Sequence, residues 1–410
     1  MRFYSQAIRQ VINWEAIQMR KPDAIFGIQN KFKEDKDPRK ISLVIGAYRD
    51  ELGKPYPFKV VQKAEEEIFK SKMDKEYLPI TGDANFCKVS QKLAFGINSP
   101  NIATIQALSG TGALSLGAIF ISRFLGKNTK IYLPDPTWPN HPNIFKDAGL
   151  VNIFSYPYYN AKSNNLSYDK MVDFIKKMES NTVILLHACA HNPTGVDLTK
   201  SNWKEIVDII LDKKILPFID MAYQGFATGD IENDSYAVKL LWEKNLEFLV
   251  SQSFAKNMGL YNERIGAINI VGNSPESSEK VNSQLSLDIR TRYSNPPAHG
   301  ARIVAKILGN ENSLNEWKTE VKNVSLRIQK MRKLLYDKLI KMKAPGNWKP
   351  LIEQIGMFTY TGLNENQCKR LMEKHHIYLM LNGRISVPAI NEHNVDYLAE
   401  SINEVVNSTK

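Results

Sequence analysis

The chain has 410 residues, of which 43% are hydrophobic, enough to bury one large domain together with a smaller companion. Lys and Arg number 54 against 43 Asp and Glu, but the basic residues are scattered among acids, which favours a solvated surface over a nucleic-acid footprint. No stretch approaches the roughly 18 to 20 uninterrupted apolar residues needed to cross a bilayer, so a transmembrane role is excluded.

The first fourteen residues form a basic amphipathic segment. No acid precedes Glu15, while Arg2 and Arg9 are present. Apolar side chains fall on one arc of a helical wheel, namely Phe3, Tyr4, Ala7, Ile8, Val11 and Ile12. An acid-free, Arg-bearing amphipathic start is typical of a mitochondrial transit segment. We therefore expect residues 1–15 to direct the chain to the mitochondrial matrix, with a plain N-terminal arm and a cytoplasmic location as the alternative.

From about residue 105 to 290 short β-rich runs alternate with helical patterns, as in parallel βα units. The expected strands are Lys130 to Leu133, Val151 to Tyr156, Val183 to Ala188, Leu216 to Ile219, Phe248 to Ser251 and Ile265 to Val271. Helices are expected at Ser201 to Lys213 and Ser277 to Arg290. Because these strands contain apolar runs, we expect a doubly wound α/β domain whose mostly parallel sheet is buried on both faces.

The pattern changes after Ser294, where Asn295, Pro296 and Pro297 interrupt it. A long helix is expected from roughly Leu314 to Met342, linking two domains. Beyond it, strand-like pieces at Met357 to Tyr360 and Ile385 to Val387, with two helical stretches, predict a smaller α+β unit.

A run of small residues, Ser109-Gly-Thr-Gly-Ala113, precedes a helix-forming stretch from Leu114 to Phe124. Backbone N–H groups at a helix N-terminus favour an anion. A dinucleotide fingerprint would need a third glycine where Ser115 stands. Taken alone, this run fits a packing turn as well as a phosphate cradle.

Three further polar segments are each expected at the carboxyl end of a strand, where α/β sheets gather their ligands. They are His187-Ala-Cys-Ala-His-Asn192-Pro-Thr-Gly195, Asp220-Met-Ala-Tyr223-Gln-Gly225 and Ser251-Gln-Ser253-Phe-Ala-Lys256-Asn-Met-Gly259. Each one by itself is compatible with an ordinary turn or cap.

Together these segments resemble the class I, fold-type I pyridoxal-phosphate-dependent aminotransferases over nearly the whole chain from Trp14, and among them the aspartate aminotransferases of the mitochondrial type. The most specific stretch is Ser253-Phe-Ala-Lys256-Asn-Met-Gly-Leu-Tyr-Asn-Glu-Arg264-Ile-Gly. Further matches are Gly46-Ala-Tyr-Arg49, Tyr77-Leu-Pro-Ile, Pro136-Thr-Trp138-Pro-Asn-His141, Arg290-Thr-Arg-Tyr-Ser294-Asn-Pro-Pro and Gly383-Arg384-Ile-Ser. The resemblance implies a small domain built from residues 16–55 and 321–410, and a large cofactor-binding domain from residues 56–320.

The resemblance implies pyridoxal 5'-phosphate as cofactor, with Lys256 as the Schiff-base lysine that later moves the Cα proton. Asp220 would keep the pyridine nitrogen protonated, so that the ring can accept electrons. Tyr223 and Asn192 would hydrogen-bond the 3′ oxygen. Trp138 would stack on the ring face and border the substrate. Lys256, Asp220 and Tyr223 are thus the expected catalytic residues.

The resemblance also assigns the cofactor phosphate. Its expected ligands are Ser109, Gly110 and Thr111 at the helix N-terminus, Ser253, Arg264, and Tyr77 from the other subunit of a homodimer. Some relatives carry a serine where this chain has Ala255, so one hydroxyl contact is expected to be missing. The three cysteines lie about 100 or more residues apart, and no metal site is expected.

The resemblance also implies that two arginines select the substrate. Arg384, with Asn192 and the Gly46 backbone, would clamp the α-carboxylate, because a guanidinium matches a carboxylate bidentately. Arg290 would reach across the dimer interface to the side-chain carboxylate of aspartate or glutamate. Pro139 and Arg292 depart from the family pattern, with no effect that the sequence defines.

The expected reaction is transamination of L-aspartate and 2-oxoglutarate to oxaloacetate and L-glutamate by a ping-pong route. A broader aromatic or kynurenine aminotransferase is the alternative within enzymes, if Arg290 swings aside. A catalytically idle protein that binds nucleic acid or acidic membranes is the alternative outside them, and the presence of every catalytic residue type argues against it.

Overall fold

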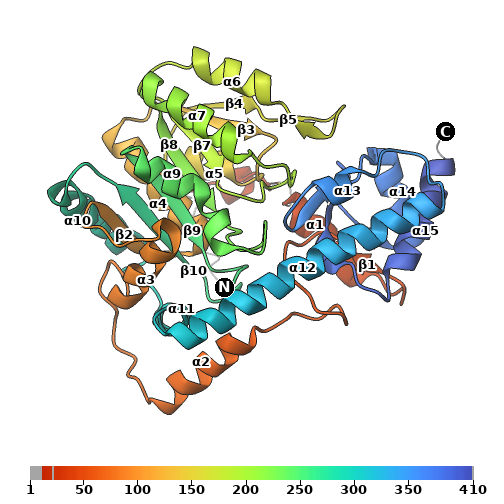
Figure 1. Cartoon of the computed structure of the whole chain (residues 1–410), viewed down its shortest axis with the longest axis horizontal. Coiled ribbons are helices and arrows are strands. Elements are labelled where there is room, and N and C mark those ends of the chain that lie inside the picture. Colours follow the sequence, from red (N-terminus) through yellow and green to blue (C-terminus); the bar gives the residue numbers. More distant parts are fainter. Residues whose placement is uncertain (1–11, 21–22, 409–410) are drawn as a thin grey trace, which may run out of the picture.

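The computed structural model describes residues 12–20 and 23–408 (Figure 1). Residues 1–11 of the predicted targeting segment lie outside the described residues. Within the described part, no helix is both long enough and apolar enough to cross a membrane.

The centre of the molecule is a mostly parallel sheet. Among the described residues it has seven strands in the order β2-β10-β9-β8-β7-β3-β4. The strands are β2 (Ile102–Leu108), β3 (Lys130–Asp135), β4 (Asn152–Pro157), β7 (Val183–His187), β8 (Leu216–Met221), β9 (Phe248–Ser253) and β10 (Ile265–Val271). Only β10 runs against its neighbours, antiparallel to both β2 and β9, within this described sheet. The predicted doubly wound α/β domain with a mostly parallel sheet is therefore confirmed.

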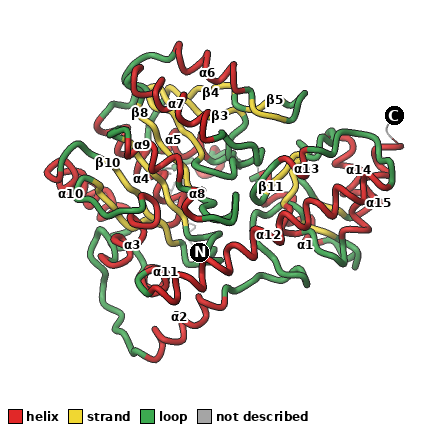
Figure 2. The backbone as a smooth tube through the Cα atoms, viewed as in Figure 1, coloured by secondary structure: helices red, strands yellow, loops and turns green. Residues whose placement is uncertain are grey.

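Helices cover both faces of this sheet, as Figure 2 shows. The pleat sends alternate side chains of β7 to opposite faces: Val183 and Leu185 join one apolar cluster, and Ile184 and Leu186 join another. The first face is covered by α4 (Ser109–Phe124), α5 (His141–Asp147) and α10 (Pro275–Arg292). The second is covered by α3 (Ala84–Phe95), α6 (Tyr168–Lys177), α7 (Lys200–Lys213) and α9 (Tyr236–Glu243). Two-sided burial explains why the central strands contain runs of consecutive apolar residues.

Two details differ from the sequence prediction. The strand β2 was not predicted, because Thr104 and the buried Gln106 interrupt its apolar run. The helix expected from Leu114 begins at Ser109 instead, since small residues do not obstruct a first helical turn. The phosphate-cradle candidates therefore lie inside the first turn of α4.

The C-terminal unit is a smaller α+β assembly to which the N-terminal segment contributes. It contains β11 (Phe358–Tyr360), β12 (Ile377–Tyr378), β13 (Arg384–Ser386), α13 (Pro350–Glu353), α14 (Glu365–His375) and α15 (Val395–Ser408). From the N-terminal side, β1 (Ile41–Ser42) pairs in parallel with β12, and α1 (Ala24–Glu34) packs nearby. This pairing supports the predicted small domain built from both ends, while its bounds stay a prediction.

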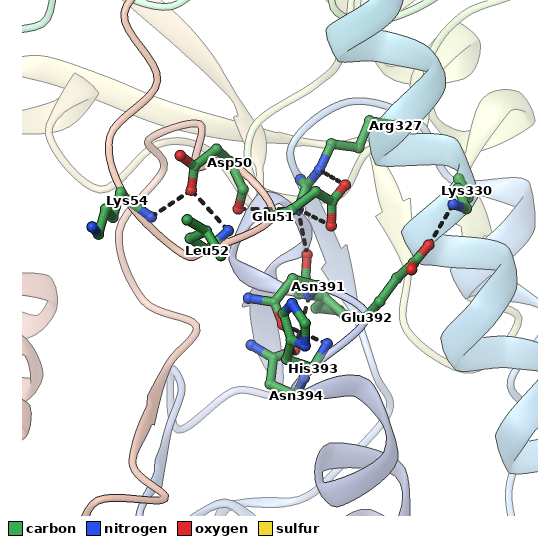
Figure 3. Close-up of polar contacts among 11 residues, drawn as sticks. Asp50, Glu51, Leu52, Lys54, Arg327, Lys330, Asn391, Glu392, His393 and Asn394 are labelled. Carbon is green, nitrogen blue, oxygen red and sulfur yellow. Dashed lines mark hydrogen bonds and ion pairs between the residues drawn. The ribbon is translucent and has the colours of Figure 1, made fainter.

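The long helix α12 (Glu311–Lys341) runs from the large unit to this smaller one (Figure 1). Figure 3 shows how its side chains hold loops from both ends of the chain. Arg327 bonds the Glu51 carboxylate at 2.6 Å and the carbonyl oxygen of Ile390 at 3.2 Å. Lys330 pairs with Glu392 at 2.5 Å. The helix therefore fastens the loop after residue 49 to the loop before α15.

Candidate active site

A cavity of about 160 Å³ lies at the carboxyl ends of β8 and β9, beside the first turn of α4. The C-terminal unit closes its other side with Phe358 and Arg384. All the predicted site residues except Tyr77 and Arg290 line it, namely Gly46, Ser109, Gly110, Thr111, Trp138, Asn192, Asp220, Tyr223, Ser253, Lys256, Arg264 and Arg384. This is the location expected for a ligand in an open α/β sheet.

Lys256 follows β9 and presents its amine to the cavity. Burial lowers the pKa of this amine, the Asp220 carboxylate partly offsets that effect, and Arg264 adds to it. Its Nζ lies 5.1 Å from the centroid of the Tyr223 ring. A lowered pKa leaves more of the amine neutral, the form that acts as nucleophile and base.

Asp220, at the end of β8, is hydrogen-bonded by one histidine and lies near a second. Its carboxylate lies 3.2 Å from Nε2 of His141 and 3.9 Å from Nε2 of His187. His141 is fixed in turn by Thr137, whose hydroxyl lies 2.7 Å from Nδ1. Burial by itself would raise the pKa of Asp220, but the hydrogen bond and charge of His141 outweigh it and the pKa is lowered. Asp220 therefore stays ionised inside a buried site.

The same trio has another conceivable use. The ligand atoms of His141, His187 and Asp220 lie within 4.8 Å of one another, a spacing that could also hold a metal ion. Burial lowers the pKa of His187 to about 3, so its ring is neutral at ordinary pH. The existing bond from His141 to Asp220 makes orientation of the carboxylate the simpler role.

An anion cradle lies at the start of α4. Oγ of Ser109 is 3.0 Å from Oγ of Ser253. A Cβ on Gly110 would meet the Ser253 Cβ at 3.2 Å, so a glycine keeps this approach open. Ser109, Gly110, Thr111, Ser253 and the basic residue Arg264 line the same cavity, and Asp220 is the one carboxylate among the described lining residues. The donor set fits a phosphate.

Asn192 and Tyr223 face one another in the cavity. Nδ2 of Asn192 donates to the Tyr223 hydroxyl at 3.3 Å, while Oδ1 of Asn192 is buried without a partner among the described residues. Burial raises the pKa of Tyr223, so its hydroxyl remains a donor. Both side chains are thus available to an oxygen-bearing ligand, as the fit of pyridoxal phosphate requires.

Arg384 is a buried cation that has no carboxylate partner among the described residues. Its side chain is 3% exposed, and Nη2 donates to the carbonyl oxygen of Val44 at 2.7 Å. Its Nε has no partner within the described part of the chain. Burial lowers the pKa of this guanidinium. A buried guanidinium left without an anion suits an anionic ligand.

Tyr77 and Arg290 do not line the cavity of their own chain. The Tyr77 side chain is 84% exposed, and Arg290 is an exposed residue that donates to the Ser294 hydroxyl. Their expected action across a subunit interface stays a prediction. Pro139 and Arg292, the two departures, are also exposed.

Sequence reasoning missed several cavity residues. Phe358, Ala222, Leu114 and Ile25 also line the cavity. Their apolar side chains carry no chemical signal in the sequence. His141 stood in a quoted motif without a role, and its distance to Asp220 now gives it one.

Comparison with known proteins identifies the family. The model of the family "Aminotransferase class I and II" matches residues 38–402. The chain is 45% identical to the mitochondrial aspartate aminotransferase of Gallus gallus, over 96% of this chain and 94% of the relative. It is 44% identical to the cytoplasmic aspartate aminotransferase of Dictyostelium discoideum, over 95% of this chain and 89% of the relative.

Solved structures agree with this result. The aspartate aminotransferase from Saccharomyces cerevisiae cytoplasm superposes with a TM-score of 0.94 at 41% identity, covering 97% of this chain and 99% of that chain. The aromatic-amino-acid aminotransferase from Burkholderia pseudomallei, covalently bound to pyridoxal phosphate, gives 0.93 at 39% identity, covering 96% and 100%. The chain therefore belongs to the class I and II aminotransferase family of pyridoxal-phosphate-dependent enzymes.

Proposed function

We propose that the protein is an aspartate aminotransferase that converts L-aspartate and 2-oxoglutarate to oxaloacetate and L-glutamate by a ping-pong route. The observation that carries this proposal is the buried Arg384, which has no carboxylate partner in the described chain and lines the same cavity as the Lys256 amine. One group binds an α-carboxylate and the other acts on the adjacent Cα. The relatives named above support the dicarboxylic substrate.

When bound, pyridoxal phosphate supplies a carbonyl that condenses with amines and a ring that accepts electrons. The side chains of the cavity do the remaining work. Ser109, Ser253 and Arg264 would hold its phosphate, and the ionised Asp220 would keep its ring nitrogen protonated. Lys256 would carry the cofactor and, once displaced by the substrate amine, its free amine would take the proton from Cα and return it.

Substrate orientation comes from the other side of the cavity. Arg384 binds the α-carboxylate as a two-point clamp, assisted by Asn192 and the Gly46 backbone. Trp138 forms an apolar wall. Closure of the small domain over the site would exclude water from the proton transfer at Cα.

The proposal includes a homodimer in which Tyr77 and Arg290 complete the partner's site. Their exposure on the single chain supports this arrangement, because neither side chain is buried within its own chain. A mixture of Lys256→Ala and Arg290→Ala chains tests it. If Arg290 acts in trans, each mixed dimer regains one intact site; if it acts in cis, every site stays defective and no activity returns.

Broader specificity for aromatic amino acids is the second candidate, because aromatic aminotransferases are among the structural neighbours. The ratio of kcat/KM for aspartate to that for phenylalanine separates the two. We expect aspartate to be preferred, and Arg290→Ala to abolish the preference. An unpaired desolvated charge costs on the order of 3 kcal/mol, equivalent to a preference of about 100-fold.

We also propose a mitochondrial location, supported by the composition of residues 1–14. The relatives include both mitochondrial and cytoplasmic proteins. A fluorescent fusion with residues 1–13 is expected to reach mitochondria, and one without them is not. A cytoplasmic signal from both fusions would assign the segment to a plain arm.

An absorbance spectrum before and after addition of L-aspartate tests the activity. The wild type should show a visible cofactor band that aspartate converts to a shorter wavelength, and Lys256→Ala should show no turnover. Lys341→Ala, at the exposed end of α12, is the matched control and should behave as the wild type. A wild type without any band after addition of pyridoxal phosphate would overturn the proposal.

A further inference from the structure

The two segments that carry Tyr77 and Arg290 are fastened to each other by side-chain amides. Nδ2 of Asn295 donates to the carbonyl oxygen of Leu78, the residue after Tyr77, at 2.7 Å. The Ser294 hydroxyl lies 2.7 Å from Oδ1 of Asn295 and also accepts a hydrogen bond from Arg290. A continuous chain of hydrogen bonds therefore joins the Arg290 guanidinium to the backbone beside Tyr77.

Gln106 makes a second bridge between the same two segments. Its side chain, on β2, is fully buried. Nε2 donates to the carbonyl oxygen of Pro297 at 2.7 Å, and Oε1 accepts from the backbone N–H of Asp83 at 3.0 Å. A Cβ on Gly82 would lie 2.2 Å from the Gln106 Cβ, so only a glycine permits this approach.

The chemistry of these bridges requires carboxamides. An amide side chain offers an N–H₂ donor and a carbonyl acceptor on separate atoms without a charge, which lets it bond two different segments at once. A carboxylate at residue 295 would face the Leu78 carbonyl with a second acceptor, and an alanine would leave that carbonyl unpaired. The linking residue Ser294 has a φ of +67°, which a non-glycine residue adopts only when its surroundings enforce it.

Neither amide lines the cavity, so neither is a catalytic residue. Each acts on the position of other groups. Asn295 sits between the residue expected to contact the cofactor phosphate and the residue expected to contact the distal carboxylate of the substrate. A shift at either contact would therefore be transmitted to the other.

We propose that Asn295 and Gln106 are positioning residues that hold Tyr77 and Arg290 as a single unit, so that binding of the cofactor phosphate and selection of dicarboxylic substrates depend on one another. This inference rests on the proposed function, in which both residues enter the partner's site. Neither Tyr77 nor Arg290 alone would couple binding of the cofactor phosphate to selection of the substrate.

The decisive variant is Asn295→Ala, measured with two readouts. Titration of the apoprotein with pyridoxal phosphate should show about tenfold weaker binding, the effect of one lost hydrogen bond in a half-buried position. The kcat/KM for aspartate should fall about tenfold relative to that for phenylalanine, which does not use Arg290. In a Tyr77→Phe background the same substitution should cost no further cofactor affinity, because the contact it positions is already gone.

A third readout does not involve the loaded enzyme. Hydrogen exchange of the apoprotein should become faster in residues 77–83 of Asn295→Ala. Asn295→Asp, which keeps the acceptor toward Ser294 and loses the donor to Leu78, should match it. Asn312→Ala, at an exposed position of α12, is the control and should change none of these values.

The outcomes separate the two proposals. A wild type that fails to transaminate aspartate overturns the proposed function and this inference together. If the wild type is active but Asn295→Ala keeps its cofactor affinity and its substrate ratio, the positioning role alone is wrong. Losses that simply add to those of Tyr77→Phe would also overturn the coupling, because independent sites are additive.

Discussion

The guanidinium carbon of Arg384 lies 4.3 Å from the centroid of the Phe358 ring. The two residues come from the paired strands β11 and β13. The ring also leaves no room for a side chain at residue 46, because a Cβ on Gly46 would lie 2.4 Å from the ring atom Cζ. A ring face and the Val44 carbonyl thus hold the guanidinium in place of a carboxylate. Its charge is left for the substrate.

This arrangement predicts the effect of Phe358→Leu. A desolvated cation over an aromatic face gains about 2 kcal/mol, so loss of the ring should raise KM for aspartate by about tenfold or more. The turnover number should change less, because Lys256 and Asp220 are not touched. Steady-state kinetics with Phe154→Leu, a partly exposed phenylalanine on β4, provides the control. Equal KM values for the two variants would contradict the role of the ring.

The bond between His141 and Asp220 predicts a pH effect. His141 holds the pKa of Asp220 below its ordinary value against the opposing effect of burial. Without the imidazole, burial prevails and the pKa rises. His141→Ala should therefore lose activity at a higher pH than the wild type as the solution is acidified. Profiles of kcat/KM against pH measure this, with His393→Asn, an exposed histidine, as control. An unchanged acid limb would refute the assignment.

Arg332 predicts a change in stability rather than activity. Its guanidinium is buried, donating to the carbonyl oxygens of Leu351, Gly356 and Phe358, and burial lowers its pKa to about 9. Arg332→Met would leave these carbonyls unpaired, at about 1 to 3 kcal/mol for each unmet group. We expect the free energy of unfolding to fall by at least about 3 kcal/mol in urea denaturation. Lys333→Met, on the exposed side of the same helix, should cost under about 0.5 kcal/mol.

The sequence predicted those strands in which burial alone determines the residue types. The strands β7, β9 and β10 were predicted because two-sided burial gives each of them a run of consecutive apolar residues. The strand β2 was missed because Gln106 is buried there for its hydrogen bonds to other segments. The periodicity of apolar residues does not predict hydrogen bonds between segments that are far apart in the sequence.

For the candidate site, sequence motifs predicted the residues with chemical roles. The structure was needed to identify the neighbouring residues that position them. The Asp220 and Lys256 segments carried recognisable chemistry, and both reach the cavity. Phe358 and His141 act through geometry, since one supports Arg384 and the other orients Asp220. Only the folded chain brings these pairs together, because more than 20 residues separate the members of each pair along the sequence.

Asp234 holds the loop that follows Tyr223. Its carboxylate accepts from the backbone N–H groups of Gly225 and Ala227 at 2.7 Å and 3.1 Å, and from the Thr228 hydroxyl at 2.6 Å. Burial raises its pKa from the ordinary 3.8 to about 6, although these hydrogen bonds oppose the rise. The folded protein therefore binds this proton more tightly than the unfolded chain does.

The sign of the resulting pH dependence follows from that difference. The contribution of the Asp234 proton to stability is complete below pH 3.8 and is lost as the pH rises through about 6. The carboxamide introduced by Asp234→Asn cannot titrate, so the stability of the wild type relative to this variant should fall by about 2 kcal/mol between pH 4 and pH 6, and should level off above about pH 7. Denaturant unfolding at several pH values measures it. Thr228→Val removes a donor that favours the ionised carboxylate, so it should move this window to higher pH. A difference that stays flat from pH 4 to pH 7 would show that the hydrogen bonds, not burial, control Asp234.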